Sequence, residues 1–349
     1  MKKRVIVAMS GGVDSSVSIY LLQKAGYEVC GITLRLSAES EHVNAASKIA
    51  AKLNIEHRIL DIQQKFKAEI IDYFAQEYLL GHTPNPCLRC NHLIKFGKLM
   101  DIAVKEDAYF ATGHYSRIDY DPVKDIYMIK KAKDAKKDQS YVLFMLDQLK
   151  LSRLLLPLAD KTKQEIKLIA QQLDLGLDLS KESQDICFIP DKDYVSYIKN
   201  YLVDFSTQPG EIINSQGKVI GRHKGIIFYT IGQRKGLGIA HPEPLFVTRI
   251  NRKENTIIVG TESELYNQGC VLNNTYFSHP DFKQPNFKAK VKIRYHHEPA
   301  QAQISQQSNN SYQLEFLQPQ KSITIGQGAV FYDQEDRVIG GGIISKIIY

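Results

Sequence analysis

The sequence predicts an α/β fold, in which a doubly wound parallel sheet is followed by two small β-barrel domains. Two observations predict it. Short apolar runs alternate with amphipathic stretches through the first 204 residues, which is typical of β-α-β units. From about residue 205 the chain consists of short β-rich pieces separated by Gly, Asn and Pro, a texture that favours hairpins and barrels. We therefore expect three domains in the 349 residues, at 1–204, 205–268 and 269–349.

The expected elements of the first domain follow from its apolar periodicity. The expected strands are the runs at 5–9, 29–34, 58–62 and 108–112. Helices are expected over 13–21 and 66–78, where apolar residues recur every four positions. Ligands of such a Rossmann-like sheet bind beyond the carboxyl ends of its strands.

In the second half, the segment 210–221 predicts a hairpin, and 301–311, rich in Gln, Ser and Asn, predicts a polar hairpin tip. The run 288–295 alternates basic and apolar residues, so one face of that strand is expected to be cationic and the other buried.

Composition excludes several classes of protein. Hydrophobic residues make up 43% of the chain and charged residues 24%, as in ordinary globular proteins. We see no apolar stretch of membrane-spanning length and no signal peptide, so no membrane partner is expected. The net charge of +7 permits a nucleic-acid partner. Five scattered cysteines fit a reducing compartment, and we expect a cytoplasmic protein.

The segment 10–16, S-G-G-V-D-S-S, joins the first strand to the first helix. Small residues at a helix N-terminus expose backbone N–H groups, which makes the segment a candidate anion cradle. It lacks the Lys of the G-x-x-x-x-G-K-[ST] loop and the third Gly of G-x-G-x-x-G. Asp14 is a candidate ligand of Mg²⁺ on bound phosphates. The alternative interpretation is a simple capped turn.

Two cysteines lie in the turn-rich segment 83–91, T-P-N-P-C-L-R-C-N. If Asn91 caps the helix that follows, Cys90 lies at a helix N-terminus beside Arg89, and both features lower the pKa of a thiol. The alternatives are two buried thiols or half of a zinc site completed by His82 or His92, although no second close pair of cysteines exists. Cys187 taken alone, like Cys30 and Cys270, is typical of a buried core thiol.

Taken together, these segments resemble a known family. S-G-G-x-D-S is the PP-loop signature of enzymes that cleave ATP between its α- and β-phosphates. The segments 83–91, 111–115, 137–141, 182–190, 230–239 and 326–332 resemble, in order and nearly end to end, the bacterial tRNA-specific 2-thiouridylases.

The resemblance implies that ATP adenylates the C2 oxygen of the wobble uridine in glutamate, glutamine and lysine tRNAs, after which sulfur replaces that oxygen. It implies that Cys90 is the nucleophile and that Cys187 carries sulfur as a persulfide, supplied by a sulfur-relay or cysteine desulfurase protein. The residues that it places on ATP are Ala8, Met9, Ser10, Gly11, Gly12, Val13, Asp14, Ser15, Leu34 and Gly113. The residues that it places on the tRNA are Asn85, Pro86, Cys87, His114, Lys137, Asp138, Gln139, Arg294, Tyr295 and Gln327.

One departure from the family pattern leaves the cofactor open. Members with a single loop cysteine carry Asp where this chain has Cys87. Cys87, Cys90 and Cys187 are therefore candidate ligands of three irons in a four-iron cluster whose fourth iron binds sulfide. A metal-free persulfide route, with ATP and Mg²⁺, is the equal alternative.

The RNA-binding surface is expected at the basic runs 130–137 and 281–298, the second of which has Tyr295 and His296 between its cations. Either run is otherwise a solvated face, and His114 is otherwise a strand-end residue bonded locally. The run 232–238 is either a tight basic hairpin or a loop that orders over the site. Two other functions stay open, another PP-loop adenylating ligase and a non-catalytic RNA-binding protein. Only thiolation requires both Cys90 and Cys187.

Overall fold

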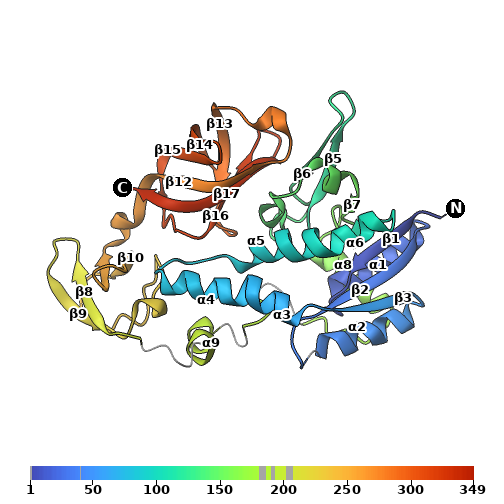
Figure 1. Ribbon diagram of the computed structural model, residues 1–349, viewed down its shortest axis with the longest axis horizontal. Coiled ribbons are helices and arrows are strands. Elements are labelled where there is room, and N and C mark those ends of the chain that lie inside the picture. The colour runs from blue at the N-terminus through green and yellow to red at the C-terminus, as the bar shows by residue number, and fades with distance from the viewer. Residues whose placement is uncertain (1, 40, 181–185, 190–192, 202–206) are drawn as a thin grey trace.

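The computed structural model describes residues 2–39, 41–180, 186–189, 193–201 and 207–349. In Figure 1 the N-terminal parallel sheet and its helices lie at one end of the molecule, and the strands of the central domain, drawn in yellow to light orange, lie at the other. The C-terminal strands, in orange and red, stand beside the long central helices.

The N-terminal sheet has five strands in the order β3-β2-β1-β4-β7, and every neighbouring pair is parallel. The strands are β1 (Arg4–Ala8), β2 (Glu28–Arg35), β3 (Glu56–Asp61), β4 (Tyr109–Ala111) and β7 (Leu154–Leu155). The four predicted strands are confirmed. The fifth was missed because two residues carry no readable periodicity.

Helices cover both faces of this sheet, which confirms the doubly wound arrangement. Val5 and Val7 pack towards α1 (Val13–Lys24) and α2 (Glu41–Lys52). Ile6, whose side chain points the other way, packs with Phe96 and Met100 on the opposite face. Helix α8 (Lys163–Gln172) packs against α1 through a separate apolar cluster.

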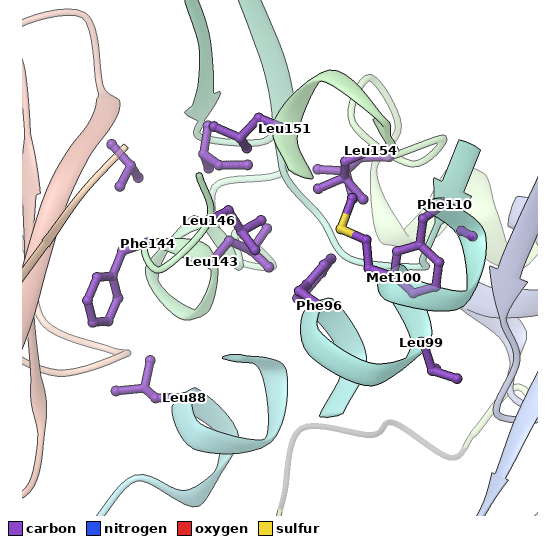
Figure 2. Packing of buried hydrophobic residues seen from close by; sticks show 14 of the residues in the cluster. Leu88, Phe96, Leu99, Met100, Phe110, Leu143, Phe144, Leu146, Leu151 and Leu154 are labelled. Carbon is purple, nitrogen blue, oxygen red and sulfur yellow. The ribbon is translucent and has the colours of Figure 1, made fainter. Parts of the chain in front are cut away.

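Two long helical segments run along the middle of the molecule, and each contains a π-helical stretch. The first comprises α3 (Gln63–Phe66), a π-helical turn at Lys67–Ile71 and α4 (Asp72–Leu79), and it confirms the helix predicted over 66–78. The second comprises α5 (Pro86–Cys90), a π-helix at Asn91–Leu99 and α6 (Met100–Lys105). Figure 2 shows Leu88, Phe96 and Met100 of this second segment in one core with Phe110 and Leu154.

A hairpin that the sequence reasoning missed joins the first domain to the last. Its strands are β5 (Arg117–Asp121) and β6 (Ile126–Lys130), and β6 pairs antiparallel with the C-terminal strand β17 (Arg337–Ile348). Helix α7 (Gln148–Ser152) follows the hairpin, and Gln148 bonds both to Tyr127 and to the carbonyl oxygen of Ser278.

The central domain has a four-stranded sheet in the order β10-β11-β8-β9. Its strands are β8 (Gly210–Asn214), β9 (Val219–His223), β10 (Phe246–Asn251) and β11 (Thr256–Gly260). The predicted hairpin over 210–221 is confirmed as β8–β9. Helix α9 (Tyr194–Tyr201) packs beside this domain through Ile198 and Ile227.

The C-terminal domain is a closed barrel of six strands in the order β12-β15-β14-β13-β16-β17, with β17 pairing back to β12. The strands are β12 (Tyr266–Phe277), β13 (Asn286–Lys292), β14 (Ala300–Ser308), β15 (Ser311–Lys321), β16 (Gly328–Tyr332) and β17. Ala289, Val291 and Ile293 are buried while Lys288 is exposed, which confirms the predicted alternation. None of the helices in the described part of the chain is long and apolar enough to span a membrane.

Candidate functional site

The segment 10–16 forms the predicted turn between β1 and α1. Gly12 is the N-cap of α1 in an extended conformation, and the first N–H groups of a helix have no intrahelical acceptor. Gly11 has a φ of +75°, and a Cβ there would lie 2.9 Å from the backbone nitrogen of Ala46 in α2. The turn therefore requires glycine at position 11 and presents free N–H groups to an anion.

The other residues predicted to bind ATP lie at the same edge of the sheet. Ala8 ends β1, and Leu34 is the penultimate residue of β2. Gly113 follows β4 and touches the first turn of α1, because a Cβ at Gly113 would lie 3.0 Å from the backbone of Asp14 and Ser15. The structure thus brings three separate segments to one place, where ligands of parallel sheets bind.

We expect Gly113→Ala to weaken ATP binding about tenfold, equivalent to about 1.4 kcal/mol. The added methyl group meets backbone rather than flexible side chains, so the first turn of α1 must shift. Isothermal titration with ATP, beside a thermal melt, measures this. Wild-type ATP affinity in a folded variant would show that the contact is irrelevant to the nucleotide.

Asp14 is held by two residues that the sequence analysis did not single out. The Lys163 ammonium lies 2.7 Å from each carboxylate oxygen of Asp14, and the Tyr115 hydroxyl donates to Oδ1 at 2.6 Å. The Lys163 side chain is only 12% exposed. The T-K-x-E pattern at 162–165 is a readable capping box that marks the start of α8. Nothing in the sequence shows that this helix end meets Asp14.

As it stands, the Asp14 carboxylate accepts three hydrogen bonds, two from Lys163 and one from Tyr115, which leaves one of its roughly four lone-pair sites for a cation. Both carboxylate oxygens already accept charge-assisted hydrogen bonds from an ammonium. A carboxylate that binds Mg²⁺ must turn a lone pair towards the ion. Coordination of Mg²⁺ by Asp14 stays a prediction, and no step below runs through it.

The helix that carries the loop cysteines begins earlier than predicted. Asn85 is the N-cap, with its side chain accepting from the backbone N–H groups of Cys87 and Leu88, and Pro86 follows at the first helical position. Pro fixes φ at a helical value and lacks an N–H that would need a partner. The prediction that Asn91 caps this helix is therefore wrong. Cys87 lies in the first turn, whereas Cys90 lies in the helix interior.

Phe188 anchors Cys187 beside these cysteines. Its ring makes edge contacts with Phe66 and Phe74 at centroid distances of 5.8 and 5.5 Å. Cys90 and Phe188 pack against the same apolar cluster, built on Phe66 and Ile94. Only 186–189 of the segment 182–190 lie among the described residues. These contacts bring Cys187 to the helix of Cys90, although 97 positions separate them.

The three thiols influence one another electrostatically, which shows that they share one site. Burial raises the pKa of Cys87 to about 11 and that of Cys90 to about 12, and in both cases a negative charge on Cys187 raises the pKa further. Burial also raises the pKa of Cys187. Cys87 and Cys187 nevertheless keep solvent-exposed surface, so both thiols are accessible from solvent.

Lys95 supplies positive charge to this site, and the sequence analysis missed it. Its charge lowers the pKa of Cys87, Cys90 and Cys187, partly offsetting burial, and it also lowers the pKa of His114. His114 follows Gly113, which touches Asp14. Lys95 and His114 therefore connect the cysteine cluster to the turn at 10–16, which we call the phosphate turn. The sequence pattern does not predict this electrostatic effect, because a lysine on an expected helix is usually a solvent-exposed residue.

The prediction of a lowered pKa for Cys90 is wrong, for two physical reasons. Cys90 does not lie at a helix N-terminus, and burial dominates its pKa. Arg89 points elsewhere, since its guanidinium donates to the backbone oxygen and the carboxylate of Glu69 and lies over the ring of Tyr73. The predicted buried states of Cys30 and Cys270 are confirmed.

The raised pKa predicts how Cys90 reacts with iodoacetamide. Because a higher pKa leaves less thiolate at a given pH, the alkylation rate should climb about tenfold per unit from pH 7 to 10 without a plateau. Lys95→Met should slow it further, since that charge lowers the pKa. Mass spectrometry of the Cys90 peptide gives the rate. A plateau below pH 9 would contradict the burial argument.

Among the described residues, no group of three or more His, Cys, Asp or Glu side chains is arranged to hold one metal ion. A four-iron cluster would need three thiolates disposed around it. Its three thiolates bind three different irons rather than one ion, so the cluster stays a prediction, and no step below runs through it.

The C-terminal barrel holds the loop that precedes these cysteines. The N–H groups of Thr83 and Asn85 donate to the carbonyl oxygens of Ile325 and Gly326 at 3.0 and 3.3 Å. The Gln327 side chain donates to the Thr83 oxygen at 2.7 Å. Gln327, a predicted tRNA residue, thus lies at the cysteine loop.

Arg294 and Tyr295 extend the same surface from the end of β13. The guanidinium of Arg294 bonds to Thr324 and to the backbone oxygen of Ile231, while its Nε is buried and has no partner in the described part of the chain. Burial raises the pKa of Tyr295 to about 12, and the charge of Cys87 adds to that shift, so the ring lies near the cysteine. Next to Ile231 is a pocket of about 490 Å³ whose lining includes Tyr194 and Gln233.

Of the other residues predicted to contact tRNA, His114 and Asp138 are buried, whereas Lys137 and Gln139 are half-buried. His114 is 7% exposed, bonds to Thr112 at 2.8 Å and has its pKa well below the ordinary value because of burial. Asp138 is 5% exposed and accepts from Ala132 and Ser140. Gln139 accepts from the N–H of Tyr115. Their contacts to tRNA stay predictions.

The parallel sheet, the phosphate turn and the adjoining cysteines define an enzyme of the ATP-using PP-loop class. Three family models match the chain: a tRNA methyl transferase HUP domain at 3–191, a tRNA methyl transferase PRC-barrel domain at 195–261 and an aminomethyltransferase beta-barrel domain at 267–344. The chain belongs to the tRNA-specific 2-thiouridylase family.

The curated relatives carry that family's name. The tRNA-specific 2-thiouridylase MnmA 2 of Thermoanaerobacter sp. (strain X514) is 42% identical over 361 residues, covering 99% of both chains. MnmA 1 of Caldanaerobacter subterraneus subsp. tengcongensis is also 42% identical over 361 residues, again with 99% of each chain covered. MnmA of Clostridium perfringens is 40% identical with the same coverage.

Proposed function

We propose that this protein is an ATP-dependent tRNA sulfurtransferase that converts the wobble uridine of glutamate, glutamine and lysine tRNAs to 2-thiouridine. The observation that carries the proposal is the meeting of Cys87, Cys90 and Cys187 in one cluster. An adenylating ligase has no need to bring together thiols that lie 97 positions apart. A non-catalytic RNA-binding protein would need neither the thiols nor the phosphate turn.

The phosphate turn supports the first step, adenylation of the base. The C2 oxygen bonds to the α-phosphorus of ATP while the bond to the bridging oxygen of pyrophosphate breaks. The free N–H groups of α1 and the nearby residues Ala8, Leu34 and Gly113 hold the nucleotide. Adenylation makes the oxygen a good leaving group, because it departs as AMP.

Sulfur transfer then uses the two cysteines. Cys187 receives a sulfur atom as a persulfide from a donor protein, and its exposed position supports such delivery. Cys90 attacks the sulfur bonded to Cys187, which forms a Cys90–Cys187 disulfide and releases hydrosulfide. Hydrosulfide displaces AMP at C2. In the alternative route the outer sulfur of the persulfide attacks C2 and AMP leaves. Cys90 then attacks the sulfur of Cys187, which releases the thiolated base and forms the same disulfide. An external dithiol reduces the disulfide in either case.

The surface beside the cluster supports binding of the anticodon loop. Tyr295 near Cys87 offers a ring on which an extruded base can stack, and the guanidinium of Arg294 beside it adds positive charge. Gln327 and Asn85 fix the loop over which the base would lie. The run 130–137, five Lys against one Asp, adds charge for phosphates, with Lys137 to Gln139 at its end.

We propose that residues 1–204 bind ATP and carry out catalysis, that 205–268 form the central domain, and that 269–349 bind tRNA. As an enzyme acting on tRNA, the protein would work in the cytoplasm.

One assay tests the function. The protein is incubated with ATP, Mg²⁺, a dithiol, unmodified glutamate tRNA, and cysteine with a cysteine desulfurase, and the nucleosides are analysed by mass. We expect 2-thiouridine at the wobble position, with one AMP and one pyrophosphate for each. Pyrophosphate release with ammonia, and none with sulfur, would favour the ligase instead.

The cluster alternative has its own test. We expect protein purified without oxygen and then freed of iron by a chelator to thiolate as fast as untreated protein. Loss of activity on iron removal, with recovery on reconstitution, would replace the persulfide route by the cluster route.

A further inference from the structure

Lys163 brings a positive charge to the phosphate turn from 149 positions along the chain. Its ammonium lies 2.7 Å from both carboxylate oxygens of Asp14, and its side chain is 12% exposed. The Asp14 side chain is 30% exposed, so the pair is only partly buried, and such an ion pair adds little to stability on its own.

Two features fix the position of Lys163, the start of its helix and a backbone hydrogen bond. It is the first residue of α8, after the capping box of Thr162 and Glu165, and its own N–H donates to Asp134 at 2.9 Å. Asp14 is the second residue of α1. The ammonium therefore lies at the first turn of α1, where the N–H groups lack acceptors.

The phosphate turn needs such a cation. The segment 10–16 lacks the lysine with which G-x-x-x-x-G-K-[ST] loops reach the outer phosphates. Helix N–H groups alone supply a charge of only about +0.5 against the multiple negative charges of ATP. An ammonium has three N–H donors, and Asp14 occupies two. The third has no oxygen acceptor in the described part of the chain.

We propose that Lys163 binds the triphosphate of ATP and the pyrophosphate that leaves, and that Asp14 is the residue that positions it. The inference rests on the proposed function, because it gives the adenylation step its cation. As the bond from the α-phosphorus to the bridging oxygen breaks, the electron pair goes to pyrophosphate, and Lys163 stabilises that charge. When the site is empty, Asp14 neutralises the lysine.

The test measures binding of ATP and of inorganic pyrophosphate by titration in the absence of tRNA, so it does not depend on thiolation. We expect Lys163→Met to weaken both about 100-fold, because each ligand loses its partner in a desolvated charge pair. Lys163→Arg should keep most of the affinity. Lys161→Met, two residues earlier in the same segment, should bind both ligands like wild type.

Lys163→Met removes a contact to the ligand and also leaves the Asp14 carboxylate without its cation. The double variant Asp14→Asn/Lys163→Met removes the second effect, because it has no unpaired carboxylate. We expect it to melt like wild type and still bind pyrophosphate as weakly as Lys163→Met. Recovery of wild-type affinity in the double variant, or unchanged affinity in Lys163→Met, would overturn the proposal. If the affinities follow the expectation but wild-type protein makes no 2-thiouridine, the proposed function fails and the phosphate role of Lys163 stands.

Discussion

Replacing Cys187 by Ser is expected to lower the rate of 2-thiouridine formation from a persulfide donor by more than about 1,000-fold. A serine hydroxyl cannot carry sulfane sulfur, so the donor has no acceptor on this chain. Thiolation of glutamate tRNA, followed by nucleoside mass analysis, measures the loss.

Folding and ATP affinity should survive this change. The Cys187 residue is exposed, and its position depends on the Phe188 ring rather than on the thiol. The melting temperature and the ATP dissociation constant therefore serve as controls. A folded Cys187→Ser variant that keeps more than about a tenth of the wild-type rate would show that sulfur reaches the base by another path.

Replacing Cys90 by Ser is expected to stop turnover just as completely, whereas its neighbour Cys87 provides a matched control. Cys90 breaks the bond that holds sulfur to Cys187, and a serine hydroxyl at the same place does not. The Cys90→Ser variant should load a persulfide on Cys187 and then stall, which intact-protein mass spectrometry shows as a mass increase of one sulfur. Cys87→Ser should continue to make 2-thiouridine.

Two results would count against this division of roles. Equal loss in Cys87→Ser and Cys90→Ser would mean that the three thiols act as one set, as a cluster requires. Full activity in Cys90→Ser would mean that Cys187 delivers sulfur without help.

The sequence predicted the α/β part well because its strands and helices have strong periodicity, as in β1, β2 and α1. It missed β7, which is two residues long, and the β5–β6 hairpin, whose strand β6 pairs with β17. That pairing is a tertiary effect, and no local pattern encodes it. The closed barrel likewise depends on β12 pairing with β17.

Local motifs and the family resemblance predicted which cysteines form the site. They did not predict that the pKa values of these cysteines are raised. Cys90 lies in the helix interior because the helix is capped by Asn85, six residues earlier than the expected cap Asn91. The cations that act on the site, Lys95 and Lys163, are ordinary lysines in the sequence. Only the packing of α8 on α1, and of 186–189 on the central helices, gives them their neighbours.

The central claim is that sulfur on Cys187 and an adenylated uridine meet in one site. The most direct measurement loads Cys187 with a ³⁵S persulfide, removes the donor, and adds ATP, Mg²⁺ and unmodified glutamate tRNA for a single turnover. The account predicts that the label moves to the wobble 2-thiouridine with an equal amount of AMP, and that it stays on the protein without ATP. Label that remains on Cys187 while AMP and pyrophosphate form would contradict it.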